Sequence, residues 1–75
     1  MALALLTIDD LARIAAAGGG FRIDGSRRAV DDLARLAAAA GRGGGSVTIT
    51  GLKMYSVDDL ARLAAAGKGH VILED

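Results

Sequence analysis

The phrase D-D-L-A-R-L-A-A-A-G stands at residues 58–67 of a 75-residue chain. Two near-identical copies precede it, D-D-L-A-R-I-A-A-A-G at residues 9–18 and D-D-L-A-R-L-A-A-A-A-G at residues 31–41. The copies begin 22 and 27 residues apart, which is the range of repeat lengths in proteins built from stacked supersecondary units. We therefore expect a short array of repeats.

Each copy has the periodicity of an amphipathic α-helix. In the third copy, apolar or small residues recur at helical spacing, and these are Val57, Leu60, Ala61, Ala64 and Gly67. The twin aspartates of each copy fall in the first turn, where the helix dipole favours negative charge. The pattern predicts helices over residues 8–17, 30–40 and 57–66.

Every copy also places an aspartate four residues before an arginine. The pairs are Asp9 with Arg13, Asp31 with Arg35, and Asp58 with Arg62. This order is the favourable one for an ion pair along one helix. We therefore expect each arginine to pair with the aspartate of its own helix.

The ends of the predicted helices carry capping residues. Thr7 and Ser56 stand at the N-cap position, whereas the middle copy has Ala29 there and is less well capped. Glycines close the helices at the C′ position, and these are Gly18, Gly41 and Gly67. The glycine runs leave a helix and enter a strand, which is the reverse of a phosphate-binding loop. We therefore interpret them as helix caps and flexible connectors.

Short segments of alternating polarity separate the helices and predict strands over residues 21–24, 47–50 and 71–74, with a further strand over residues 2–6. Strands that alternate with helices form a parallel sheet with helical crossovers. The expected fold is a single α/β domain over residues 1–75, a βαβαβαβ array with three helices on one face of the sheet. This array has two layers and is solenoid-like, and a rearranged strand order is the structural alternative.

The unit V-x-I-x-G at residues 47–51, followed by S-x-D-D-L-x-x-L at residues 56–63, resembles a leucine-rich repeat. Gly25 and Gly51 stand where that class has Asn or Cys. The D-D-L-A-R-L-A-A-A-G phrase is also similar to short, uncharacterised bacterial proteins built almost wholly of this unit, and the similarity covers nearly the whole chain. It implies a β/α repeat fold and no assigned activity.

Composition excludes several classes of function. Nine Lys and Arg residues balance nine Asp and Glu residues, so no net field attracts nucleic acid or an anionic membrane surface. The chain has no cysteine, and His70 is its only histidine, which argues against a disulfide scaffold and a zinc site. We expect no cofactor, no metal, no nucleic acid and no membrane partner.

The sequence also indicates where the protein works. Its apolar runs, such as residues 1–6, are far shorter than the roughly 20 residues that a membrane-spanning helix needs. The first residues lack the basic region of a signal peptide, and Asp9 and Asp10 interrupt the apolar stretch. We therefore expect a cytoplasmic protein.

Catalytic residue patterns are not recognisable. The adjacent aspartates of each copy diverge by about 100° around a helix, whereas glycosidase and metal sites need convergent carboxylates. The serines carry no nucleophile-elbow pattern, and these are Ser26, Ser46 and Ser56. We therefore expect no enzyme activity.

One edge of the predicted sheet is a candidate ligand site. Ligands of open parallel sheets bind beyond the carboxyl ends of the strands. At that edge, Arg27, Arg28 and Lys53 form a candidate anion clamp, and Tyr55 adds a stacking surface. The competing interpretation is that the arginines balance the nearby aspartates and that Tyr55 packs on Leu60 as a hydrophobic staple.

Two hypotheses on function follow. The first is a non-catalytic module for protein interaction or assembly, which binds a protein partner or a second copy through a sheet edge or an exposed face. Its supporting features are the outer strands at residues 2–6 and 71–73, and Ile72 on an otherwise polar face. The second is a small anion- or nucleotide-binding domain that uses the edge just described.

Overall fold

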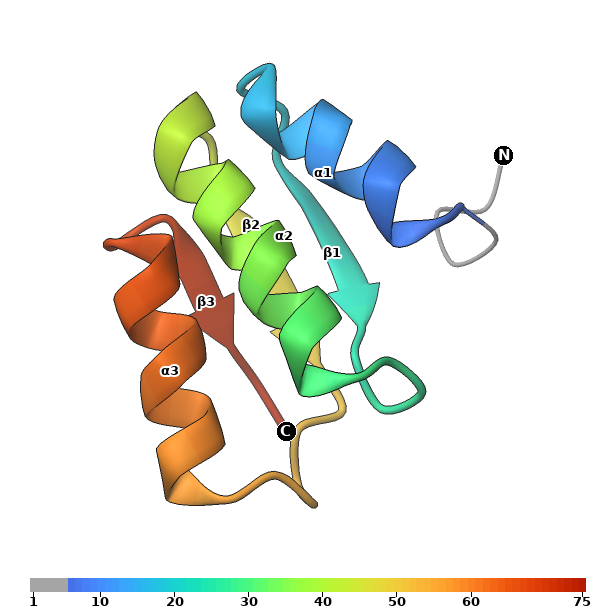
Figure 1. The fold of residues 1–75 in the computed structure, drawn as a ribbon, viewed down its shortest axis with the longest axis vertical. Coiled ribbons are helices and arrows are strands. Elements are labelled where there is room, and N and C mark those ends of the chain that lie inside the picture. Colours follow the sequence, from blue (N-terminus) through green and yellow to red (C-terminus); the bar gives the residue numbers. More distant parts are fainter. Residues whose placement is uncertain (1–5) are drawn as a thin grey trace.

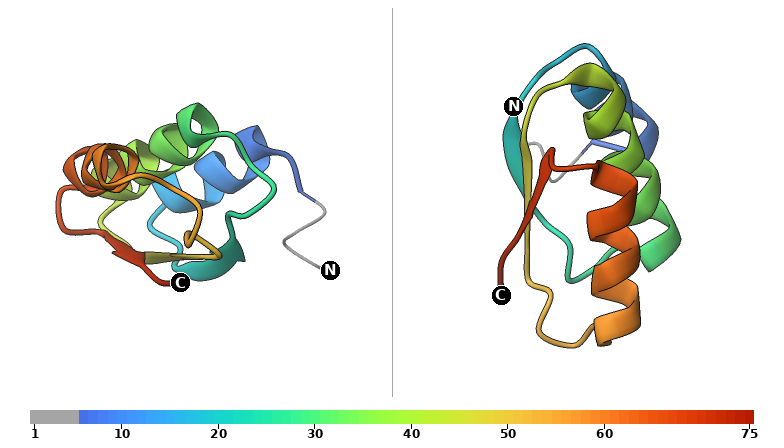
Figure 2. Two further views of the ribbon diagram at one scale, coloured as in Figure 1. Left: turned by 90° about the horizontal axis from the view of Figure 1, so that it is seen from below. Right: turned by 90° about the vertical axis from the view of Figure 1, so that its left-hand side faces the viewer.

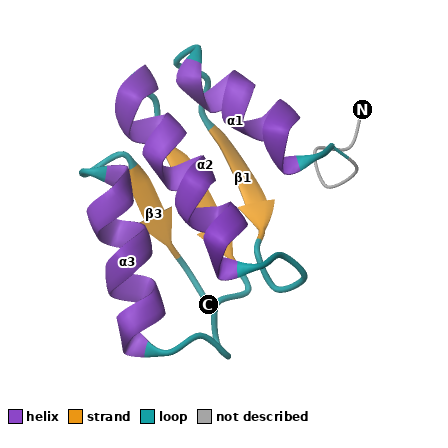
Figure 3. Cartoon of the chain, in the orientation of Figure 1, coloured by secondary structure: helices purple, strands orange, loops and turns teal. Residues whose placement is uncertain are grey.

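A computed structural model describes residues 6–75 of the chain (Figure 1). Helices and strands alternate along these residues (Figure 3). In chain order they are α1 (Ile8–Ala16), β1 (Phe21–Asp24), α2 (Val30–Gly43), β2 (Val47–Thr50), α3 (Val57–Gly67) and β3 (Val71–Leu73). The strand predicted at residues 2–6 lies outside the described residues except for Leu6, which forms a bend before α1.

The strands form one parallel sheet in the order β1-β2-β3, with Phe21 opposite Val47 and Val47 opposite Val71. All three helices lie on the same side of this sheet, so the molecule has two layers (Figure 2). The predicted fold class, an α/β array with helices on one face of a parallel sheet, is confirmed. The strand order follows the sequence, and the rearranged order is wrong.

The core lies between the two layers. Ile23, Val47 and Ile49 point from the sheet toward the helices and are buried. The helices cover them with fully buried leucines, and these are Leu11, Leu33, Leu36 and Leu63. In β2 the alternate residues Thr48 and Thr50 are only partly buried, as expected for a sheet with one covered face.

The first turns of the helices follow the capping prediction. The backbone N–H of Asp10 donates to the Thr7 hydroxyl at 3.2 Å, and the N–H of Asp59 donates to the Ser56 hydroxyl at 3.1 Å. Ala29 supplies no side-chain cap to α2. The outer helices are therefore capped by side chains and the central helix is not.

The last turns of α2 and α3 differ from the prediction. Gly18 has φ +93° and follows α1 as expected, but Gly41 lies inside α2, which runs three residues beyond its expected end, and Gly67 lies inside α3. The left-handed residues that end these helices are Gly44, at φ +81°, and Lys68, at φ +49°. The remaining bounds differ by one residue, since α1 ends at residue 16 and β3 at residue 73.

Close packing explains why glycine stands at positions 41 and 67 inside these helices. A Cβ atom on Gly41 would lie 3.1 Å from the carbonyl oxygen of Gly67, and one on Gly67 would lie 2.4 Å from Cγ1 of Val71. Both glycines therefore lie where two elements approach closely, and neither has a left-handed backbone.

Candidate functional site

The predicted ligand edge lies in the loops that follow β1 and β2, residues 25–29 and 51–56. The Tyr55 hydroxyl lies 2.9 Å from the carbonyl oxygen of Gly25 and also hydrogen-bonds the carbonyl oxygen of Arg28. Its ring packs against the core together with Leu60. Tyr55 therefore braces one loop against the other, and its predicted staple contact with Leu60 stays a prediction.

The three cations of this edge have separate surroundings. Nη2 of Arg28 donates to the carbonyl oxygen of Leu6 at 3.2 Å. Lys53 is exposed and makes no hydrogen bond or ion pair within residues 6–75. Arg27 is exposed near Asp24. The structure joins Tyr55 to the backbone of Arg28, and the anion clamp stays a prediction.

Asp24 shapes the first of these loops. Its carboxylate accepts hydrogen bonds from the backbone N–H of Ser26 at 2.9 Å and from the Ser26 hydroxyl at 3.0 Å. These bonds stabilise the charged form, so the pKa of Asp24 is lowered from its ordinary value, and the charge of Arg27 adds to the effect. Arg27 therefore faces a carboxylate of its own chain.

A small cavity of about 80 Å³ opens at the same edge of the sheet. Leu52, Leu60, Leu73, Glu74 and Asp75 line it. Ligand pockets usually have volumes of about 300–1,000 Å³. This cavity is far smaller, and none of the four predicted ligand residues lines it.

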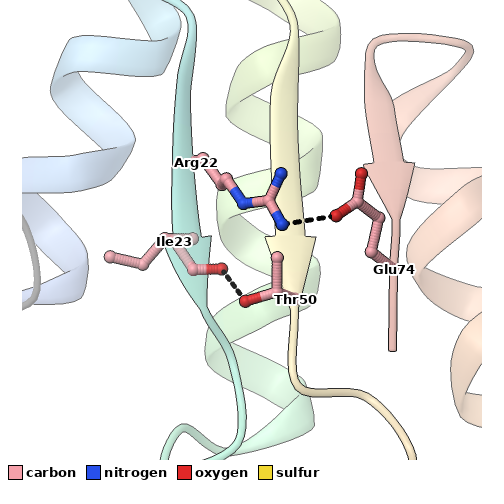
Figure 4. Close-up of polar contacts among 4 residues, drawn as sticks. All are labelled: Arg22, Ile23, Thr50 and Glu74. Atoms are coloured by element: carbon pink, nitrogen blue, oxygen red, sulfur yellow. Dashed lines mark hydrogen bonds and ion pairs between the residues drawn. The ribbon is translucent and has the colours of Figure 1, made fainter.

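The uncovered face of the sheet carries polar side chains (Figure 4). The Arg22 guanidinium reaches from β1 across β2 to the Glu74 carboxylate, at an N–O distance of 2.8 Å. The Thr50 hydroxyl donates to the carbonyl oxygen of Ile23 at 3.4 Å. Ile72 is 50% exposed on this face. This face is therefore polar with one apolar side chain beside the edge of β3.

The arginines of the helix layer pair between helices and not within them. Arg35 of α2 forms an ion pair with Asp9 of α1, and Arg62 of α3 pairs with Asp31 of α2 at 2.7 Å. The predicted pairing within each helix is wrong. Both pairs are exposed to solvent and join neighbouring helices.

The glycine runs at the opposite edge of the sheet are packing positions. A Cβ atom on Gly43 would lie 2.0 Å from the carbonyl oxygen of Ala15, and one on Gly45 would lie 2.7 Å from that of Gly18. The interpretation as flexible connectors missed this role. A signal was present, because glycines recur where successive repeats leave their helices.

His70 lies at the start of β3. Its Nδ1 atom is 2.9 Å from the carbonyl oxygen of Gly45, so the ring links the turn before β3 to the segment before β2. Within residues 6–75, no three His, Cys, Asp or Glu side chains are grouped as a metal site would need. The same residues include no helix with the length and apolar character to cross a membrane.

Comparisons with known proteins identify no relative of this chain. No protein-family model, no curated protein and no solved structure matches this chain.

Proposed function

We propose that the chain is a non-catalytic protein-interaction or assembly module of the bacterial cytoplasm, similar in build to a leucine-rich repeat array. Repeat arrays bind partners through extended surfaces and not through enclosed pockets. Within residues 6–75, the helices cover one face of the sheet and leave the other face accessible. A flat, two-layer domain of this kind offers a large surface for its size.

The observation that carries the proposal is the outer edge of β3. This strand pairs with β2 on one side, and no strand within residues 6–75 pairs with its other side. An open strand edge displays backbone N–H and C=O groups that bind a strand of another protein. Ile72 lies beside this edge and is half exposed, so it adds an apolar contact to the backbone hydrogen bonds.

A capture experiment with paired variants tests the proposal. The chain is immobilised and exposed to extract of the native cell and, separately, to purified chain. Ile72→Lys places a charge beside the open edge, while Met54→Lys is the matched control, because Met54 is 95% exposed in the loop between β2 and α3.

We expect the wild type and Met54→Lys to retain the same partner stoichiometrically, whether that partner is another protein or a second copy of the chain. We expect Ile72→Lys to retain it at least about tenfold less well, because the edge contact is lost. No stoichiometric partner on the wild type, or equal retention by both variants, contradicts the proposal that the β3 edge is a binding surface.

A further inference from the structure

The contact between α1 and α2 and the contact between α2 and α3 are built in the same way. Residues of α1 correspond to residues 22 positions later in α2 and 49 positions later in α3, as the repeated phrase shows. In both contacts the arginine of the later helix pairs with the first aspartate of the earlier one, Arg35 with Asp9 and Arg62 with Asp31. Each helix therefore has a leading face, which packs on the preceding helix, and a trailing face, which receives the next.

Within residues 6–75, no other helix covers the leading face of α1. Its residues Arg13, Ile14 and Ala17 correspond to Arg35, Leu36 and Ala39 of α2 and to Arg62, Leu63 and Ala66 of α3. Leu36 and Leu63 are fully buried, whereas Ile14 is 38% exposed. Arg13 forms no ion pair within the described residues, and with Asp10, Ile14 and Ala17 it lines an open groove.

The trailing face of α3 likewise has no helix packed on it among the described residues. Its residues Asp58, Ala61 and Ala64 correspond to Asp31, Ala34 and Ala37 of α2. Ala34 and Ala37 are buried, whereas Ala61 and Ala64 are exposed. Asp58 has no ion-pair partner in the described part of the chain, although both of its counterparts have one.

We propose that the leading face of α1 binds the trailing face of α3 in a second copy of this chain, with Arg13 paired to Asp58 of that copy. This inference rests on the proposed function as an assembly module and names the partner. The two faces are complementary. The leading face of α1 offers a cation and a large apolar side chain, and the trailing face of α3 offers an anion and small alanine side chains. The existing α1–α2 and α2–α3 contacts show that the same residue types fit together.

The predicted assembly is open-ended. Two different surfaces meet in a head-to-tail contact, so each added copy leaves one leading face and one trailing face unoccupied. The interface repeats the helix spacing of the chain, and successive copies therefore extend the helix layer. The average mass is then expected to rise steadily with concentration and not to stop at a dimer.

Charge reversal at each face separates this contact from other kinds of association. Arg13→Asp reverses the cation of the leading face, and Asp58→Arg reverses the anion of the trailing face. Both side chains are exposed, so the variants are expected to fold, which circular dichroism checks. Lys53→Asp is the control, because it reverses an exposed charge in the loop before α3 and leaves both faces intact.

Sedimentation equilibrium is the measurement. We expect concentration-dependent association of the wild type and of Lys53→Asp, and an association about tenfold weaker for Arg13→Asp and for Asp58→Arg alone. A one-to-one mixture of these two variants restores association, because the intact leading face of one meets the intact trailing face of the other, and the two reversed charges attract as well. This rescue is a readout that a folding defect would not produce.

Three outcomes overturn the inference: a chain that stays monomeric at millimolar concentration, association that neither reversal weakens, and a mixture that fails to recover. The capture experiment separates the two proposals. A monomeric chain that retains a different protein through β3 leaves the proposed function standing, whereas a monomeric chain that retains nothing removes both.

Discussion

The central helix α2 and its neighbours α1 and α3 share one sequence phrase but have different surroundings. Six residues of α2 are buried, against two in α1 and two in α3. Leu36 of α2 is fully buried, and its counterpart Ile14 of α1 is 38% exposed. The repeated phrase therefore specifies a helix, while the position of that helix in the layer determines which of its side chains are buried.

The difference extends to the ends of the helices. The outer helices begin with side-chain caps from Thr7 and Ser56, and α2 begins at Ala29 without one. Packing on both sides stabilises α2, since helices in proteins gain most of their stability from tertiary contacts. In the described part of the chain each outer helix packs against one neighbouring helix, so its cap contributes a larger share of its stability.

The largest effect is expected when the side chain at the same position of the repeat is truncated in α2 and in α1. Leu36→Ala removes a fully buried side chain of the hydrophobic core and is expected to cost about 2–5 kcal/mol of unfolding free energy. Ile14→Ala is expected to cost less than about 1 kcal/mol, because the side chain is partly exposed. Urea unfolding at low protein concentration measures both free energies. Similar losses at the two positions would show that the position of a helix in the layer does not control how much this side chain contributes to stability.

The second test concerns the distance between the helices. Gly43→Ala places a Cβ atom 2.0 Å from the carbonyl oxygen of Ala15, so α1 and α2 must separate, and a loss of about 1–3 kcal/mol is expected. Gly41→Ala is the matched control on the other side of α2, where the nearest atom, the carbonyl oxygen of Gly67, is 3.1 Å away.

The expected cost of Gly41→Ala is smaller, because alanine is the better helix former by about 1 kcal/mol and a small shift relieves the contact. Thermal unfolding, monitored by circular dichroism, shows which of the two variants is less stable. A Gly43→Ala protein as stable as the wild type would contradict the tight α1–α2 contact.

Much of the fold is predictable from local pattern. β1 and β2 occupy the residues at which alternating polarity placed them, and the helices begin where the N-cap residues stand. Both signals are encoded within a few neighbouring residues. The ends of α2 and α3 were not predictable in this way, because Gly41 and Gly67 serve contacts with other elements and look like helix terminators in the sequence.

The candidate site was harder to predict for the same reason. The hydroxyl of Tyr55 binds carbonyl groups 30 and 27 residues away, and no local spacing encodes that contact. The partner of Arg35 is equally non-local: a residue pattern along one helix indicates Asp31, whereas the packed layer offers Asp9 of the helix beside it. Periodicity predicts which residues share a face and does not predict what lies opposite that face.

The smallest expected effect comes from giving the central helix the cap that its neighbours have. The backbone at Ala29 has φ −70° and ψ 149°, close to the values at Thr7 and Ser56, so a serine fits there without strain. Ala29→Ser lets the new hydroxyl accept a hydrogen bond from the backbone N–H of Asp32, the counterpart of Asp10 and Asp59. We expect a gain of only about 0.5 kcal/mol in the unfolding free energy, because packing on both sides already stabilises α2.

The reverse change, Ser56→Ala, is the matched control and is expected to cost about 1 kcal/mol, because it leaves the N–H of Asp59 without its acceptor. Urea unfolding of both variants compares the two helix starts directly. If packing already holds the first turn of α2 as firmly as a cap would, the gain from Ala29→Ser falls well below the loss from Ser56→Ala. Equal and opposite changes would instead mean that the cap contributes the same stability whether a helix has one neighbour or two, which would contradict the link between packing and capping drawn from α2.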